Sequence, residues 1–234
     1  MNEIALTYKV LALAFNSPTE ELVAALRATD FFGAALPEDV DVEALLHEHT
    51  RVFSLTVAGG VAPYQLEYGD PGAFSKTQRM ADIAGFHKAF GVGLTAQERV
   101  DHIGAELELM HWLICKEERG VEVENNEQVQ VCRDAVTKFM DDHLGRWAPF
   151  FAEQLTLAAR DPFYSALGQA LGDFIGEECK RLGVEPDVIT MPAPPSCGAE
   201  FGCQLEKEGT AAKEATDVPS RTRPAARLVT KPID

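Results

Sequence analysis

A short charged turn in the middle of the chain directly precedes its most apolar predicted helix. Arg99, Asp101 and His102 lie in this turn, and Glu106 follows four residues after His102. A carboxylate can bind a guanidinium through two parallel hydrogen bonds, so Asp101 suits either Arg99 or an arginine of a ligand. Asp is also favoured at the start of a helix, where its side chain accepts backbone N–H groups. Contact with a basic ligand and capping of the helix both remain open, and one carboxylate can serve both.

A predicted loop carries a second set of side chains with suitable chemistry. Tyr64, Glu67 and Tyr68 follow the sequence Gly-Gly-Val-Ala-Pro, whose glycines and proline indicate a loop. Aromatic rings stack on a guanidinium and a carboxylate pairs with it, so these residues fit a peptide that contains arginine. They also fit a loop held in place by two half-buried tyrosines. The sequence leaves both interpretations open.

Glutamate and histidine side chains near the turn raise the alternative of a metal site. Glu108 and His111 form a Glu-x-x-His pair, but a di-iron bundle needs a second such pair and the sequence has none. His102 and Glu106 are four residues apart and share a helix face. A helical metal-binding protein or enzyme built on these four residues is therefore the alternative hypothesis, and no bound metal is the main expectation.

Other catalytic or metal-binding motifs give no further support for an enzyme. Cys197 and Cys203 are too far apart for a Cys-x-x-Cys site and have no histidine nearby, so we expect two thiols without a fixed partner. Phosphate-binding loops, nucleotide-binding glycine motifs and the serine-hydrolase and zinc-protease motifs do not occur. We predict no catalytic residues and no cofactor.

The helix that follows the charged turn is predicted to lie inside a helical bundle. Residues 101–119 place aliphatic side chains at helical spacing on one face, and further apolar side chains cover most of the rest. A helix with so little polar circumference is typical of the middle of a bundle. The first face consists of Ile103, Leu107, Met110 and Ile114, and the remainder is covered by Leu109, Trp112 and Leu113.

The rest of the sequence predicts further helices and no convincing β-strand. Ser17 and Pro18 mark the start of a second helix, with Ser as the cap and Pro at the first helical position. The predicted fold class is all-α, a single-domain bundle of about eight helices. The predicted helices cover residues 3–15, 18–29, 42–55, 74–90, 101–119, 126–143, 147–160 and 162–182.

Charge and composition limit the partners. The 234 residues include 21 basic and 37 acidic side chains, for a net charge of −16. This charge argues against binding to nucleic acid and favours a cationic partner. No apolar run reaches the length of a membrane span, and the first residues lack the basic start of a secretory leader, so we expect a cytoplasmic protein without stable membrane insertion. Five cysteines, an odd number, fit reduced thiols.

The composition changes after Gly183. Residues 184–234 hold seven of the 13 prolines and no long apolar stripe, which predicts a disordered tail after a folded domain of residues 1–183. The tail holds six basic and eight acidic residues, so fifteen basic and twenty-nine acidic residues belong to the domain. A cationic partner should therefore meet the folded domain.

Four segments, in the same order, resemble the TorD/DmsD family of redox-enzyme maturation chaperones. The signature is an acidic residue followed by Arg-x-Asp-His-Ile and then Glu-Leu-x-x-Met, and together the segments span most of the chain, about residues 5–182. Residues 98–110 resemble that signature, residues 62–68 a Pro-Tyr-Glu-Ser-x-Tyr loop, residues 80–92 the helix before the signature, and residues 143–150 a later turn.

The resemblance implies an all-helical, non-catalytic cytoplasmic chaperone. Such a protein binds the twin-arginine leader, and often the body, of a molybdenum enzyme precursor, assists cofactor insertion and holds back premature export. Here it would be a monomer or a homodimer; an accessory subunit retained in the redox complex is a further alternative. Val100 stands where the family usually has Pro, and Gln65 where it usually has Glu. The implied leader-binding residues are Tyr64, Glu67, Tyr68, Arg99, Asp101, His102 and Glu106.

Overall fold

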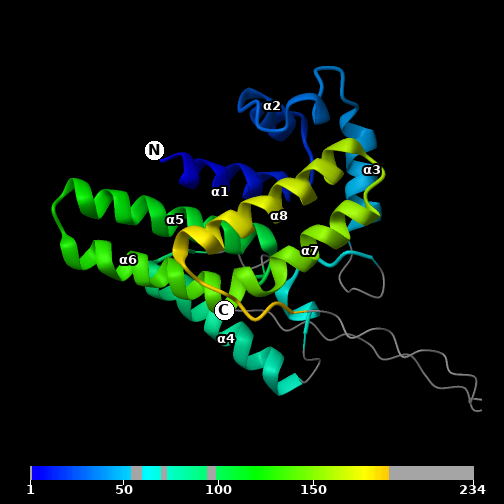
Figure 1. Ribbon diagram of the computed structural model, residues 1–234. Coiled ribbons are helices and arrows are strands. Elements are labelled where there is room, and N and C mark those ends of the chain that lie inside the picture. The colour runs from blue at the N-terminus through cyan, green and yellow to red at the C-terminus, as the bar shows by residue number, and fades with distance from the viewer. Residues whose placement is uncertain (1, 54–59, 70–72, 94–98, 190–234) are drawn as a thin grey trace, which may run out of the picture. The chain divides into compact units, whose positions relative to one another are not determined.

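The computed structural model describes residues 2–53, 60–69, 73–93 and 99–189, all of which lie in a compact unit formed by Met1–Pro192. Eight α-helices occur in these ranges, and the only β-type pairings within them are two isolated bridges, so the predicted all-α class is confirmed (Figure 1). The helices are α1 (Glu3–Ala14), α2 (Glu20–Ala28), α3 (Val42–Val52), α4 (Ala73–Phe90), α5 (Ile103–Glu122), α6 (Asn126–Phe139), α7 (Gly145–Ala158) and α8 (Pro162–Leu182).

Helix α5 lies in the centre of the packing. It packs against α1 on one side and α6 on the other, while α7 packs along α8 (Figure 1). The apolar side chains predicted for its core face are buried, with Leu107, Leu109 and Met110 completely inaccessible. Burial of such side chains stabilises the fold by roughly 1.5–3 kcal/mol each. The bundle core is therefore built around the helix that the charged turn precedes.

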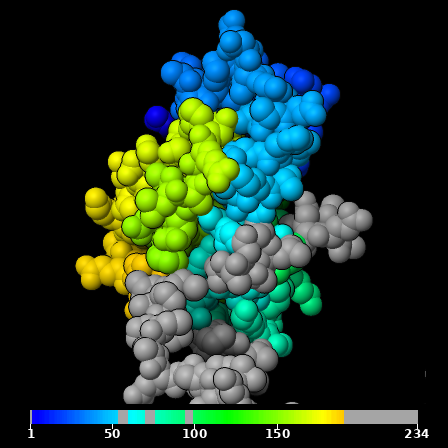
Figure 2. All heavy atoms as spheres, turned by 90° about the vertical axis from the view of Figure 1, so that its right-hand side faces the viewer, coloured from blue at the N-terminus to red at the C-terminus, as the bar shows by residue number. Residues whose placement is uncertain are grey.

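Helix α3 is tied to the connection between α7 and α8 by a single carboxylate. Glu48 Oε1 accepts hydrogen bonds from the backbone N–H of Arg160 at 2.7 Å and of Asp161 at 3.3 Å. Glu48 also pairs with Arg51, and this hydrogen bond is the main reason why the pKa of Glu48 falls to about 2. Figure 2 shows the atoms of α3 beside those of the α7–α8 connection.

Two predicted helix starts are corrected by the structure. The cap of α2 is Thr19, whose side chain accepts from the backbone N–H of Leu22 at 3.2 Å, so Ser17 and Pro18 lie before the helix. The cap of α5 is His102, whose Nδ1 accepts from Gly104 N at 3.1 Å. Asp101 is therefore not the cap, because its carboxylate is occupied by other partners described below.

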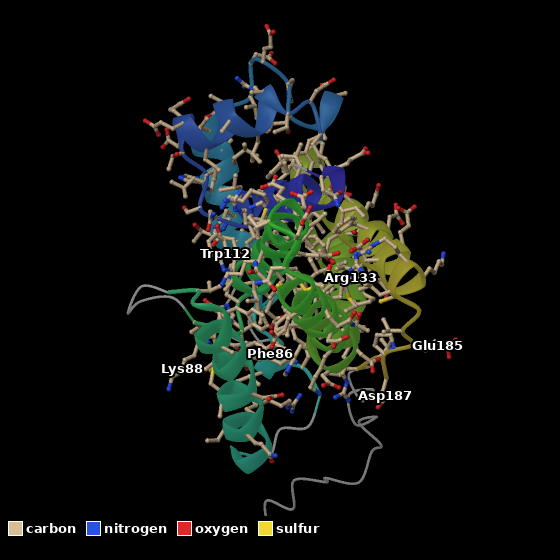
Figure 3. All side chains as sticks on the ribbon, turned by 90° about the vertical axis from the view of Figure 1, so that its left-hand side faces the viewer. Phe86, Lys88, Trp112, Arg133, Glu185 and Asp187 are labelled. Atoms are coloured by element: carbon tan, nitrogen blue, oxygen red, sulfur yellow. The ribbon has the colours of Figure 1, made fainter. Side chains whose placement is uncertain are left out.

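One of the apolar side chains predicted to cover most of the rest of α5, Trp112, is exposed at the surface. Trp112 is 43% exposed, and its indole N–H donates to Phe90 O at 3.1 Å at the end of α4 (Figure 3). The ammonium group of Lys116 lies 5.5 Å from the centre of the indole ring. The indole can remain at the surface because its polar N–H is bound and a cation covers its ring.

A π-helical turn joins α6 to α7 where the sequence predicts a break. Residues Met140–Leu144 continue the helix with a wider turn, and this turn buries His143. Gly145 follows, and a Cβ there would lie 2.7 Å from Met140 O. The absence of a side chain at this position lets the backbone pass close to the turn.

The predicted C-terminal tail falls largely outside the described residues. Residues 184–189 follow the left-handed Gly183 that ends α8, with φ of 69°. The Ile189 N–H donates to Arg146 O at 2.7 Å, and its side chain is 9% exposed. The boundary at Gly183 and the disorder of the tail stay predictions.

Close packing of α7 on α8 generates a stability prediction. A Cβ on Gly168 would overlap Thr156 Oγ1 and lie 2.8 Å from Ala152 O, whereas a Cβ on Gly176 of the same helix meets nothing within 4 Å. Gly168→Ala should lower the free energy of unfolding by about 1–3 kcal/mol through overpacking. Gly176→Ala, the matched control, should raise it by about 0.5–1 kcal/mol. Urea unfolding followed by circular dichroism measures both, and equal effects would contradict the packing argument.

Candidate peptide-binding site

Asp101 and Arg99 form a bidentate pair at the centre of the site. Arg99 Nε donates to Oδ1 at 2.9 Å and Nη2 donates to Oδ2 at 2.7 Å. The backbone N–H of Leu66 also donates to Asp101 Oδ2, at 3.3 Å. The Asp101 side chain is completely buried, and its hydrogen bonds raise the pKa of Arg99 above its usual value. The carboxylate thus joins the charged turn to the loop at residues 61–69.

Backbone pairing fixes the same two segments side by side. Tyr64 and His102 form an antiparallel bridge, in which Gln65 N donates to Asp101 O at 2.8 Å and Ile103 N donates to Pro63 O at 2.9 Å. The two sets of candidate residues, which are separated along the sequence, therefore meet at the start of α5.

Four partly exposed side chains form the outer face of this junction, and we call them the Tyr64 surface. The Arg99 guanidinium lies 4.1 Å from the centre of the Tyr64 ring, and the His102 ring is 5.3 Å away on an edge-to-face contact with Tyr64. Glu67 Oε1 lies 3.8 Å from Arg99 Nη2, and its Oε2 lies 3.7 Å from Lys76 Nζ. The Tyr64 surface consists of Tyr64, Glu67, Arg99 and His102.

Three other residues predicted to contact a peptide have buried side chains. Tyr68 is 1% exposed and donates to Ala62 O at 2.8 Å, and burial raises its pKa. Glu106 is completely buried and accepts from Trp147 Nε1 at 3.0 Å. Asp101 is equally buried. The loop folds over the start of α5 and covers these three side chains, which support the residues around them. Their contact with a peptide stays a prediction.

The site also contains residues that sequence reasoning missed. Gln65 Nε2 lies 3.4 Å from His143 Nδ1, and His143 Nε2 lies 3.0 Å from Asp82 Oδ2. This chain of polar contacts connects the loop, the π-helical turn and α4. Burial lowers the pKa of His143, and the neighbouring Asp82 opposes that shift. Trp147 was missed as well, although a buried indole N–H needs an acceptor and Glu106 is a suitable one.

The comparisons with known proteins give the family. The family model described as the nitrate reductase delta subunit matches residues 11–153. The chain belongs to the nitrate reductase delta subunit family. The matched range includes both segments of the site and most of the helices that support them.

Three curated relatives of the chain are named as chaperones. The chain is 27% identical to the selenate reductase assembly chaperone protein of Thauera selenatis over 183 residues, which are 77% of this chain and 90% of that protein. It is 25% identical to the chlorate reductase assembly chaperone protein of Ideonella dechloratans, over 76% of this chain and 89% of that protein. It is 29% identical to the chaperone protein TorD of Aeromonas salmonicida strain A449, over 64% of this chain and 65% of that protein.

A solved structure supports the fold. The crystal structure of a protein from Archaeoglobus fulgidus, described as a candidate redox enzyme maturation protein, matches with a TM-score of 0.52 at 20% identity. The match covers 75% of this chain and 96% of that one. The family match and the curated relatives confirm the resemblance to redox-enzyme maturation chaperones seen in the sequence motifs, and the solved structure supports the fold alone.

The residues considered for a metal site have other partners. His111 Nδ1 donates to Ala5 O at 2.7 Å, and Glu108 forms an ion pair with Lys9 of α1. Within the described ranges no group of three or more His, Cys, Asp or Glu side chains is arranged to hold a metal ion. Cys197 and Cys203 lie outside those ranges. None of the helices with described positions is long and apolar enough to cross a membrane.

Buried Glu106 generates a pH prediction. Burial raises the pKa of Glu106 well above its usual range; the Trp147 hydrogen bond opposes this shift and nearby Asp101 adds to it. Above the ordinary pKa of a glutamate, the folded protein therefore retains a proton that the unfolded chain has released, and stability falls as pH rises toward the folded-state pKa. Glutamine imitates the protonated acid and still accepts from Trp147, so Glu106→Gln should become more stable relative to the unmodified protein as pH rises from 4 to 8.

Unfolding by urea at a series of pH values measures this trend. Glu153→Gln removes an exposed carboxylate of α7 and controls for the change in net charge. A stability difference for Glu106→Gln that is flat across the series, or that follows the control, would show that Glu106 is ionised in the folded protein.

Proposed function

We propose that this protein is a dedicated assembly chaperone for the catalytic-subunit precursor of a molybdenum-containing oxidoreductase. It binds the twin-arginine leader of the precursor, and with it the precursor body, assists cofactor insertion and holds back export until assembly is complete. It acts in the cytoplasm, where the precursor is made, as a monomer or homodimer, and it does not catalyse a reaction itself.

One observation carries this proposal. The two relatives named as reductase assembly chaperones match over about nine-tenths of their own lengths, at 90% and 89%. The similarity therefore extends over nearly the whole of each chaperone. We place leader binding at the Tyr64 surface, because this surface exposes an aromatic ring and a carboxylate on the segments that resemble the family motifs.

Glu67 has the contacts expected of a residue that receives a leader arginine. Its distances of 3.8 Å to Arg99 and 3.7 Å to Lys76 are ion-pair distances that are too long for good hydrogen bonds. Both of its oxygens can thus accept the two parallel N–H groups of a guanidinium. Such an arginine would replace Arg99 beside Glu67, while Asp101 continues to hold Arg99 from the buried side.

The charge of the folded part supports the same partner. Residues 1–183 contain twenty-nine acidic and fifteen basic side chains. A strongly negative protein attracts a basic leader over distances of about a Debye length, roughly 8–10 Å at physiological salt. Charge accelerates the encounter, whereas the close contacts at the Tyr64 surface decide which leader remains bound.

The binding test uses the twin-arginine leader peptide of a molybdenum enzyme precursor. Glu67→Gln removes one charge from a partly exposed site and should weaken binding by about tenfold to a hundredfold, since a hydrogen bond to a charged group contributes roughly 1.5–3 kcal/mol. Tyr64→Ala should weaken binding by a similar factor. Replacing the paired arginines by lysines should cost less affinity than replacing them by glutamines, because Lys keeps the charge but not the fork.

Titration calorimetry with the full chain measures these affinities, and Glu153→Gln is the charge-matched control. Asp101→Asn should also weaken binding, because Asp101 no longer holds Arg99 from the buried side, and Arg99 then competes with the leader arginine for Glu67. An unmodified protein that binds none of the three peptides would overturn leader recognition. Copurification of the chain with the mature exported enzyme would instead favour a retained accessory subunit.

A further inference from the structure

A groove lies at the opposite end of α5 from the Tyr64 surface. It has a volume of about 540 Å³ and lies between the start of α1, the last turns of α5, the middle of α6 and the end of α8. Helix α5 has 20 residues and is therefore about 30 Å long. Figure 3 looks onto this side of the molecule and labels Arg133 of α6, which lines the groove. The groove is thus separate from the site described above.

The floor of the groove is aliphatic. Ile114 is 5% exposed and Val136 is 3% exposed, and Ile4 and Leu182 are partly buried beside them. Val121 stands on the rim and is 58% exposed. The walls on α5 and α6 are mainly helix sides, whose backbone N–H and C=O groups are mostly bonded within the helix, and the first turn of α1 and the last turn of α8 complete the lining. A partner that enters must therefore satisfy its own backbone hydrogen bonds, as a helix does.

The two cations of the groove are already neutralised. Arg133 Nε binds Glu117 Oε1 at 2.7 Å, and Arg181 binds both oxygens of Glu178 at 2.6 and 2.7 Å. Glu178, which is almost completely buried, also accepts from Tyr8 at 3.0 Å, so it stays in place behind Arg181.

One carboxylate on the edge of the groove formed by α5, which we call the α5 rim, has no cationic partner among the described residues. Glu118 lines the groove and forms no hydrogen bond or ion pair with any residue whose position the structure describes. Glu122, further along the same rim, pairs with the exposed Arg119, at 2.8 Å. The negative charge left on this rim calls for a cation on the partner.

We propose that this groove binds an amphipathic helix of a partner protein, with aliphatic side chains on the floor and a lysine or arginine beside Glu118. This is a second docking surface, independent of leader binding at the Tyr64 surface. A helix with aliphatic residues at positions i, i+3, i+4 and i+7 matches a groove made of helix sides, and a basic residue at the edge of that stripe meets the α5 rim.

The probe is a synthetic helical peptide with leucines at that spacing, lysines beside the leucine stripe and alanine elsewhere. Fluorescence anisotropy with the full chain should show saturable binding. Glu118→Lys should weaken it at least tenfold, and Val121→Gln about threefold. Two variants on other faces provide matched controls, Glu153→Lys on α7 and Val131→Gln, whose side chain is 49% exposed on α6 outside the groove. Both controls should bind within twofold of the unmodified protein.

Other outcomes overturn the proposal. The proposal fails if the probe peptide shows no saturable binding. It also fails if the groove variants and their controls lose affinity equally, or if a peptide with glutamates in place of the lysines binds equally well. The leader peptide distinguishes this surface from the proposed function: its affinity should be unchanged in Glu118→Lys and Val121→Gln. If these variants weaken the leader peptide, the occupant is the leader itself and the groove is not a second docking surface. Circular dichroism of each variant verifies that the helices are intact.

Discussion

The bidentate pair between Arg99 and Asp101 is the interaction on which the candidate site depends. Removing a carboxylate from water is costly unless its oxygens are bonded, and Asp101 is completely buried. Two guanidinium N–H groups and the backbone N–H of Leu66 replace the lost water. Because one of these donors comes from the loop and the others from the turn before α5, satisfying Asp101 requires that the two segments lie together. The Tyr64 surface is the outer side of that arrangement.

Glu106 extends the same support into the core. Its carboxyl group lies one turn into α5 and accepts the indole N–H of Trp147 from α7 at 3.0 Å. Trp147 in turn packs on Tyr68, whose ring centre is 5.4 Å away and whose hydroxyl bonds to the loop. Aromatic packing thus connects the buried Glu106 to the loop that carries the partly exposed Tyr64 and Glu67. A binding surface held in this way keeps its shape before a ligand arrives, which lowers the entropic cost of binding.

The two ends of α5 have different characters because different neighbours surround them. At its start, a loop that contains one 3-10 turn, Gln65–Glu67, brings polar and aromatic side chains over the helix. At its other end the sides of α5 and α6 meet the first turn of α1 and the last turn of α8, and together they leave an aliphatic groove with charged rims. An arginine-containing segment suits the first environment, since forked hydrogen bonds require carboxylates at fixed positions. A helix suits the second, since helical walls offer packing and few free hydrogen-bonding groups.

The sequence by itself determined the class of fold and the positions of most helices. Apolar side chains that recur with the helical period must be buried on one side, so α5, α6 and α8 follow from local pattern and fall within a few residues of the predicted ranges. The order of four motifs along the chain was also sufficient to indicate the family that the comparisons then showed. These features depend on neighbouring residues and on order, both of which a single sequence contains.

Only the tertiary structure decided which candidate residues are exposed. Tyr68 has the same chemistry as Tyr64, and Asp101 and Glu106 have the same chemistry as Glu67, but the fold buries Tyr68, Asp101 and Glu106 and leaves Tyr64 and Glu67 partly exposed. Their burial depends on how a loop far away in the sequence crosses the start of α5 and on the position of Trp147. The same applies to the start of α5, where Asp101 is bonded to Arg99 and Leu66 and the cap passes to His102. Long-range contacts determine which side chains are buried and which residue caps α5. These contacts cannot be read from residue type and spacing.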